Sequence, residues 1–253
     1  MTDVRKVAVV TGGAAGIGLE ILRHLAGEGM AVLAADRDEA ACARARESLK
    51  DFGGQVKIIA ADIGTAEGAS AAVDGAVEAF SRIDLLCNNA AAHPFEMIEG
   101  HDLASWRETF RVNVDGTMLC SQAALPHMRR QGGGSIVNIG SVSGILSYAG
   151  GSVYAASKAA VAMFTKTLAL EAGPHGIRVN CICPGTIRHR AARDGDDEKP
   201  AHIPLGRAGT SADVAHLVSF LASDAASYMS GAIIALDGGA TAGRARVSKR
   251  RGA

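Results

Sequence analysis

Three polar residues in the second half of the chain have the types and the spacing for proton transfer. Tyr154 and Lys158 stand four residues apart, and Ser141 lies thirteen residues before Tyr154. If the segment is helical, a separation of four residues places both side chains on one face. Two unit charges about 4 Å apart attract by roughly 4 kcal/mol at an effective dielectric constant of about 20, so the ammonium would lower the phenol pKa from about 10. A tyrosine of this kind can exchange a proton with an alcohol or a carbonyl near pH 7.

Taken alone, this pair fits an exposed helix surface better than an active site. A glycine-rich loop near the N-terminus changes that balance, and it reads Thr11-Gly12-Gly13-Ala14-Ala15-Gly16-Ile17-Gly18. Glycines in such a loop allow a tight turn, close approach of a pyrophosphate and close packing of helix on strand. The helix that follows offers free N–H groups and a positive dipole end to phosphate. We therefore expect Gly12, Ala15, Gly16, Ile17 and Gly18 to contact a dinucleotide.

The residue that would choose this dinucleotide is Asp36, eighteen residues after Gly18 at the end of an apolar run. A carboxylate there accepts hydrogen bonds from ribose hydroxyls and repels a 2′-phosphate, which favours NAD over NADP. Arg37 follows directly and could pair with a 2′-phosphate, so NADP stays open as the less favoured alternative.

Short apolar runs alternate with longer helical patterns along the chain. Continuous apolar runs are typical of strands buried on both faces, hence of a parallel sheet covered by helices. We expect strands at Lys6–Val10, Ala31–Ala35, Val56–Ala60, Ile83–Cys87, Ser135–Ile139, Arg178–Ile182 and Ala232–Leu236. We expect helices at Ile17–Glu28, Glu39–Phe52, Ala66–Ser81, Ala104–Arg129, Val153–Ala172 and Ser211–Ala222. This order predicts an α/β protein with one doubly wound, seven-stranded Rossmann sheet, and residues 1–253 as a single domain.

Composition excludes several other classes of protein. The 253 residues carry 26 basic and 26 acidic side chains and only 4% aromatic residues, which argues against a nucleic-acid binder. Five scattered cysteines without a Cys-x-x-Cys motif indicate reduced thiols rather than a disulfide framework or a metal site. No signal peptide and no membrane span are evident, so we expect a cytoplasmic, soluble protein.

Two polar segments interrupt the alternating pattern. Thr186–Ile203 carries four basic and four acidic residues and is predicted to be a substrate lid. Gly243–Ala253 is a basic C-terminal tail, for which a solvated terminus is the expected state.

Together these residues resemble the short-chain dehydrogenase/reductase family in its single-domain form. The resemblance runs from about Val4 to Gly239. Its markers occur in order as the glycine loop, Asp62, Asn88-Asn89-Ala90, Asn113, Ser141, Tyr154-x-x-x-Lys158 and Pro184-Gly185.

The resemblance implies a role for each matching residue. Tyr154 would be the general acid/base, Lys158 would lower its pKa and bind the nicotinamide ribose, and Ser141 would bind the substrate oxygen. Asn113 would hold a water that connects Lys158 to solvent. The remaining cofactor contacts would come from Asp36, Arg37, Asp62, Ile63, Asn89, Ala90, Tyr154, Lys158, Pro184, Gly185 and Ile187. The family transfers hydride between nicotinamide and an alcohol or ketone carbon and uses no metal.

Two positions depart from the family pattern. Ala91 stands where a glycine usually follows Asn-Asn-Ala, and His189 stands where a threonine usually contacts the cofactor. His189 could enter the substrate pocket or simply face solvent. Ser143, His93 and Tyr148 are further candidates for substrate contacts, and each could equally be a wall residue.

We therefore predict an NAD-dependent oxidoreductase acting on a secondary alcohol or its ketone, with a polar substrate such as a sugar, polyol or hydroxy acid. The alternatives are an NADPH-dependent 3-oxoacyl-thioester reductase and a nicotinamide-sensing protein without turnover. By analogy with the family, Ala104–Arg129 and Val153–Ala172 would build a homotetramer or homodimer.

Overall fold

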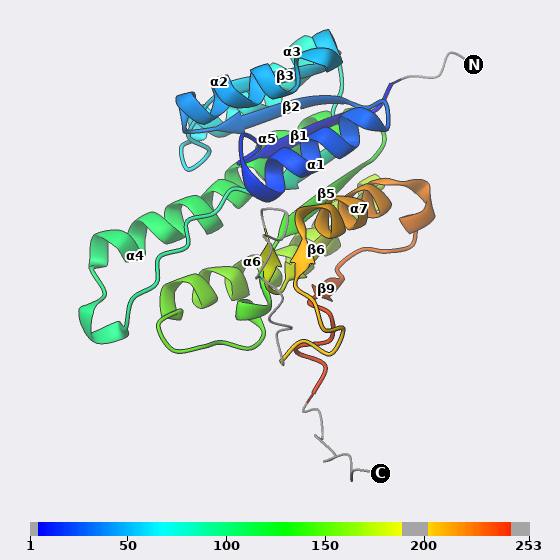
Figure 1. Cartoon of the computed structure of the whole chain (residues 1–253). Coiled ribbons are helices and arrows are strands. Elements are labelled where there is room, and N and C mark those ends of the chain that lie inside the picture. Colours follow the sequence, from blue (N-terminus) through cyan, green and yellow to red (C-terminus); the bar gives the residue numbers. More distant parts are fainter. Residues whose placement is uncertain (1–4, 189–201, 244–253) are drawn as a thin grey trace, which may run out of the picture.

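The computed structural model describes residues 5–188 and 202–243. Seven parallel strands form the central sheet in the order β3-β2-β1-β4-β5-β6-β9 (Figure 1). Their bounds are β1 Val7–Thr11, β2 Ala31–Asp36, β3 Val56–Ala60, β4 Leu85–Asn88, β5 Gly134–Ile139, β6 Ile177–Pro184 and β9 Ile233–Leu236. All seven lie within two residues of the predicted strands, and the predicted fold class is confirmed.

Helices cover both faces of this sheet, which explains the continuous apolar runs. Ala8 and Val10 of β1 belong to one core cluster, while Val7 and Val9 belong to the other. On the first face pack α1 (Gly16–Gly27), α2 (Glu39–Ser48) and α7 (Ser211–Ala222), and on the second α3 (Ala66–Phe80), α5 (Gly116–Arg130) and α6 (Ser152–Ala172). Alternate residues of one strand therefore enter different cores, and neither face can be polar.

The strand order reverses at β1, which has β2 on one side and β4 on the other. The carboxyl ends of the strands on either side of such a switch point leave a crevice, where open α/β sheets bind ligands. The loops after β1, β2, β4 and β5 all begin at this edge, so the sheet assembles the predicted site residues from distant parts of the chain.

The helix predicted over Ala104–Arg129 is present, but it is not α-helical throughout. The structure has α4 (Leu103–Phe110), a π-helical turn over Arg111–Asp115 and then α5. A π turn inserts an extra residue and is common at functional sites. Here it contains Asn113, which is fully buried.

The helix predicted over Glu39–Phe52 was also too long. α2 ends at Ser48, and a 3₁₀ segment over Lys50–Gln55 turns the chain back toward β3. Gln55 fixes this turn because its amide donates to the carbonyls of Ala26 and Met30 at 2.6 and 2.7 Å.

A short strand pair was not predicted from sequence. β7 (Ile187–Arg188) pairs in parallel with β8 (Gly209–Thr210), and this pair anchors the start of the predicted lid. Residues 189–201 of that lid and residues 244–253 of the basic tail lie outside the described residues.

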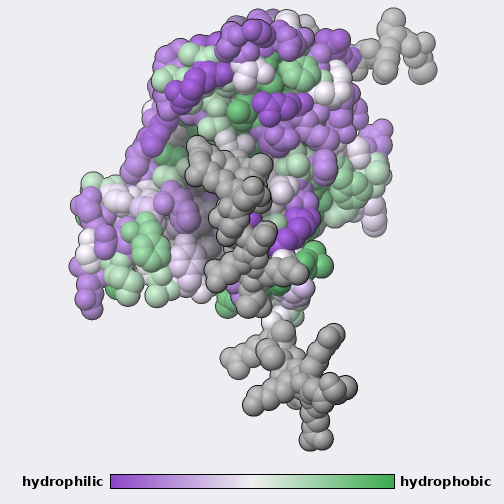
Figure 2. Space-filling view, viewed as in Figure 1, coloured by the Kyte–Doolittle hydropathy of each residue, from purple (hydrophilic) through white to green (hydrophobic). Residues whose placement is uncertain are grey.

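The surface in Figure 2 is mainly hydrophilic, with apolar side chains exposed in the region of α4. The large exposed apolar residues before and at the start of this helix are Phe95, Met97, Ile98 and Leu103. Among the helices that the structure describes, none has the length and apolar character that crossing a membrane requires.

Candidate functional site

The structure brings the predicted catalytic residues Ser141, Tyr154 and Lys158 together. Ser141 directly follows β5, while the other two lie one turn apart on α6. The side chains of Ser141 and Tyr154 line the same cavity, and Ser141 lies close enough to lower the Tyr154 pKa. The Lys158 ammonium lies 5.8 Å from the centre of the Tyr154 ring. The spacing of four residues therefore places both side chains toward Ser141, as expected for a helix.

Close packing fixes the position of Ser141 relative to α6. Ser141 begins a 3₁₀ turn over Val142–Gly144, and its hydroxyl accepts the Ser143 N–H at 3.0 Å. A Cβ on Gly144 would lie only 2.8 Å from the backbone nitrogen of Ala159. The turn can approach the helix this closely only because Gly144 has no side chain.

The Tyr154 pKa is raised in the structure, whereas the sequence predicted that Lys158 would lower it. Burial raises the Tyr154 pKa above its ordinary value, although the nearby Ser141 side chain partly offsets this rise. Burial also lowers the pKa of Lys158 to about 8. Lys158 is 3% exposed, and its ammonium donates to the Ile139 carbonyl at 2.7 Å. Desolvation of both groups outweighs their mutual attraction in the protein without a nucleotide.

Both the oxygen and the nitrogen of the Asn113 side-chain amide form hydrogen bonds to protein groups. Its Oδ1 accepts the Ala92 N–H at 2.7 Å, and its Nδ2 donates to the Ala92 carbonyl and the Ser157 hydroxyl at 3.0 and 2.9 Å. These bonds join the π turn, the loop after β4 and α6. Asn113 therefore holds the loop against the helix that carries Tyr154, and its proposed water contact stays a prediction.

Two of the predicted substrate residues meet above Tyr154. His93 Nε2 lies 2.8 Å from the Tyr148 hydroxyl, and the His93 ring is centred 3.9 Å from the Tyr154 ring. Burial, followed by the nearby Lys158 charge, lowers the pKa of His93. His93 is therefore neutral at pH 7 and can either donate or accept a hydrogen bond.

A cavity of about 490 Å³ joins these residues. The predicted residues that line it include Ser143, Pro184, Gly185 and Ile187, whereas His189 lies outside the described residues. Thr186, the first residue of the predicted lid, also lines it, and the lining residues that were not predicted are Ala91, Ile139, Gly140, Val142 and Leu146. Ile139 ends β5, and Gly140 and Val142 flank Ser141, so the sequence could have predicted these three as lining residues.

The glycine loop and the start of α1 suit the phosphates of a dinucleotide. Gly12 and Gly16 have left-handed backbones with φ of 62° and 54°. No side chain caps α1 and no acidic residue lies in its first turn, whereas α2, α3, α4 and α7 are each capped by a side chain. The first N–H groups of α1 thus have no side-chain acceptor, and the helix dipole favours an anion there.

Asn89 and Gly18 both contact the backbone of this loop. The Asn89 amide donates to the carbonyls of Thr11 and Gly12 at 2.9 and 3.1 Å. A Cβ on Gly18 would lie 2.0 Å from the Gly12 carbonyl oxygen. Both residues shape the loop, and none of Ala15, Gly16 and Gly18 lines the two main cavities.

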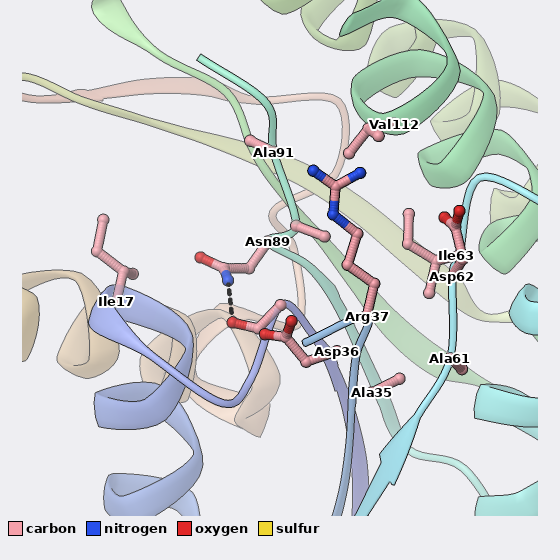
Figure 3. Close-up of a pocket in the computed structure, with 12 residues that line it drawn as sticks. Ile17, Ala35, Asp36, Arg37, Ala61, Asp62, Ile63, Asn89, Ala91 and Val112 are labelled. Carbon is pink, nitrogen blue, oxygen red and sulfur yellow. Dashed lines mark hydrogen bonds between the residues drawn. The ribbon is translucent and has the colours of Figure 1, made fainter. Parts of the chain in front are cut away.

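A second cavity, of about 350 Å³, lies at the ends of β2 and β3 (Figure 3). Its predicted lining residues are Gly12, Ile17, Asp36, Arg37, Asp62, Ile63, Asn89 and Ala90. Ala35, Ala61, Ala91 and Val112 also line it and were not predicted; the first two directly precede predicted residues, whereas Val112 depends on the π turn. Ile17, Asn89 and Ala91 line both cavities, so the two adjoin along one edge of the sheet.

Asp36 is oriented by backbone donors at the edge of this second cavity. Its Oδ2 accepts the Ala14 N–H at 3.2 Å and its Oδ1 accepts the Asp38 N–H at 3.1 Å. Each oxygen keeps a further lone pair, so the carboxylate can still accept ribose hydroxyls. A nicotinamide dinucleotide would thus be held by the glycine loop, Asp36 and the two adjoining cavities.

Comparison with known proteins agrees with this geometry. Residues 6–199 match the family model described as short chain dehydrogenase. A 2-(S)-hydroxypropyl-CoM dehydrogenase of Xanthobacter autotrophicus is 37% identical, over 94% of this chain and 97% of the relative. A cis-4-hydroxycyclohexanecarboxylate dehydrogenase of Sinomonas cyclohexanicum is 39% identical over the same shares.

A solved structure of levodione reductase superposes with a TM-score of 0.87 at 30% identity, covering 94% of this chain and 98% of that chain. The similarity therefore extends over the glycine loop, the sheet and the helix that carries Tyr154 and Lys158. The chain belongs to the short-chain dehydrogenase family and is an oxidoreductase that acts on alcohol or ketone groups.

Proposed function

We propose that the protein is an NAD-dependent oxidoreductase that interconverts a secondary alcohol and its ketone. The observation that carries this proposal is that Ser141, Tyr154 and buried Lys158 line one cavity, which adjoins the Asp36 cavity. The residues suited to proton transfer and those suited to cofactor binding thus lie in adjoining cavities along one edge of the sheet.

Each side chain has a defined part in this reaction. The nicotinamide, when bound, supplies or accepts the hydride. Tyr154 donates its proton to the ketone oxygen as the alcohol forms and takes a proton from the hydroxyl in the opposite direction. Ser141 donates a hydrogen bond to the same oxygen and stabilises the charge that develops there. Because the Tyr154 pKa is raised, the phenol is protonated at pH 7 and is in the form that can donate a proton to a ketone.

Asp36 supports the choice of NAD over NADP. It closes β2 and lines the cavity in which the adenosine ribose would lie. Its carboxylate can accept both ribose hydroxyls, and it would repel a phosphate at the 2′ position.

His93 and Tyr148 support a substrate with a second polar group. They form a hydrogen-bonded pair in the wall of the Ser141 cavity, where a substrate hydroxyl or carboxylate could replace their mutual contact. The relatives named for hydroxypropyl-CoM and hydroxycyclohexanecarboxylate agree with a polar alcohol or hydroxy acid.

A screen of substrates and cofactors tests this proposal. Sugars, polyols, hydroxy acids, simple ketones and 3-oxoacyl thioesters are assayed with NAD(H) and NADP(H), at pH 7 and pH 9. We expect turnover with a polar alcohol or ketone and with NAD, and Asp36→Ala should reduce the preference for NAD by at least about tenfold. Faster thioester reduction with NADPH would instead favour an acyl-thioester reductase, and tight NADH binding without any turnover would favour a sensor.

We also propose a homotetramer or homodimer that functions in the cytoplasm. The described structure leaves Met163 and Leu170 of α6 exposed at 61% and 80%, which an interface through this helix would cover. All five cysteines are buried free thiols, as suits a reducing compartment. Light scattering at micromolar concentration should give a mass of two or four chains, and a monomer mass would contradict the assembly.

A further inference from the structure

We propose that Glu108 on α4 is a positioning residue that sets the cofactor choice by holding Arg37 away from a 2′-phosphate. This inference rests on the proposed NAD-dependent function and identifies a determinant of it outside the glycine loop and Asp36. Glu108 lies 71 residues from Arg37 in the chain, so only the fold brings the two together.

Arg37 is well placed to bind a phosphate if nothing else holds it. It directly follows Asp36 and lines the adenosine cavity. Its side chain extends from the end of β2 toward Val112 on the other side of that cavity (Figure 3). Its guanidinium donates to Glu108 Oε1 at 2.7 Å. The cation beside the ribose position is therefore already paired, and its charge is directed toward α4.

Glu108 is itself fixed by a second arginine. Arg111 donates to Glu108 Oε2 at 2.7 Å and to Oε1 at 3.0 Å, and it also pairs with Asp62 at 2.9 Å. A Cβ on Gly64 would lie 2.3 Å from the Arg111 guanidinium, so the glycine leaves space for this arrangement. The Arg111 hydrogen bonds lower the pKa values of Glu108 and Asp62, and both carboxylates remain charged at neutral pH.

The sum of charges around the ribose position disfavours a second phosphate. Two guanidinium groups, Arg37 and Arg111, face three carboxylates, Asp36, Asp62 and Glu108. A 2′-phosphate would add a charge of about −2 to a group that is already negative. Replacing Glu108 by glutamine would leave two guanidinium groups facing two carboxylates, and Arg37 would be held only by a weaker, uncharged acceptor.

The Arg37–Glu108 pair is partly exposed, with side chains 57% and 39% accessible. Such a pair contributes little to folding stability, because water and salt screen it. Instead, Glu108 competes with a 2′-phosphate for Arg37. A phosphate can bind Arg37 only if it displaces the Glu108 carboxylate, which Arg111 holds in place. Loss of Glu108 should therefore change cofactor preference far more than it changes stability.

Titration of the protein with NADH and NADPH, followed by the fluorescence of the reduced nicotinamide, tests this without a substrate. Glu108→Gln should tighten NADPH binding by about tenfold, the worth of one charge-assisted hydrogen bond, and change NADH binding by less than about twofold. In an Arg37→Ala background, Glu108→Gln should tighten NADPH binding by no more than about threefold, the part that comes from removing one partly exposed negative charge. Arg37→Ala alone should not weaken NADPH binding by more than about twofold, because Arg37 is held by Glu108. Glu47→Gln removes an exposed carboxylate of another ion pair, with Lys50, and serves as the matched control.

Three results would overturn the inference. Glu108→Gln could change the affinity for both nucleotides equally, its full tenfold effect could persist without Arg37, or Arg37→Ala alone could weaken NADPH binding by about tenfold. Thermal unfolding of each variant shows that it is folded. A wild-type protein that binds neither nucleotide would contradict the proposed function, whereas one that selects NADH while Glu108→Gln has no effect would contradict the role of Glu108 alone.

Discussion

Replacing Tyr154 by phenylalanine should reduce turnover by at least about a thousandfold, within the range expected for loss of a general acid/base. The ring and its packing against His93 remain, whereas the hydroxyl that shares the cavity with Ser141 is lost. NADH should still bind within about threefold of the wild-type affinity, because the glycine loop and Asp36 are unchanged. Steady-state kinetics and fluorescence titration measure the two quantities separately.

The matched control for this change is Tyr228→Phe. Tyr228 is 103% exposed, so removal of its hydroxyl should alter neither turnover nor binding. Residual activity above about a tenth of the wild-type rate in Tyr154→Phe would contradict the assignment of Tyr154 as the proton donor. Equal losses of turnover and NADH binding would indicate that the hydroxyl acts on the structure of the site.

Replacing Lys158 by methionine should abolish turnover and yet raise the free energy of unfolding. Burial lowers the Lys158 pKa from 10.5 to about 8, so the folded protein at pH 7 carries a buried, poorly solvated charge. Such a shift corresponds to roughly 3 kcal/mol, and the lost bond to the Ile139 carbonyl offsets part of it. We expect a net gain of about 1–2 kcal/mol at pH 7, measured by urea unfolding.

The difference in the free energy of unfolding between Lys158→Met and the wild type should become smaller as pH rises. Between about pH 8 and pH 10.5 the unfolded chain keeps the Lys158 proton that the folded protein has released, so the penalty in the wild type declines as pH rises. The gain from Lys158→Met should therefore be full below pH 8 and diminish above it. Lys166→Met, an exposed change on the same helix, is the control and should show no such trend. A Lys158→Met protein less stable than the wild type at pH 7 would show that the ammonium stabilises the fold.

The elements that the sequence predicted well depend on local patterns. Short apolar runs such as Val7–Val10 and Ala31–Ala35, bounded by turn residues, indicate strands between two helical layers, and all their residues are buried. The spacing of Tyr154 and Lys158 and the order of glycines depend on neighbouring residues alone. The fold and the family membership could therefore be predicted from the amino-acid sequence, since hydrophobic periodicity and turn chemistry are properties of short segments.

Three features of the site could not be predicted from local sequence patterns. The π turn that buries Asn113 looks in sequence like part of one long helix, because its residues fit a helical pattern throughout. The Tyr154 pKa moves upward rather than downward, because the burial that determines it comes from the whole cavity. The predicted roles of His189 and the basic tail stay predictions, since both lie outside the described residues.

The sequence by itself determined the parallel sheet, the nucleotide loop and the kind of chemistry that Tyr154, Lys158 and Ser141 can perform. Only the tertiary structure decided which charges these groups carry and which partners they meet. It directs Lys158 to the Ile139 carbonyl, packs the His93 ring against Tyr154 and joins Arg37 to Glu108 beside the adenosine cavity. The reason is physical: desolvation and ion pairing depend on atoms brought together from distant parts of the chain, and no local spacing encodes those distances.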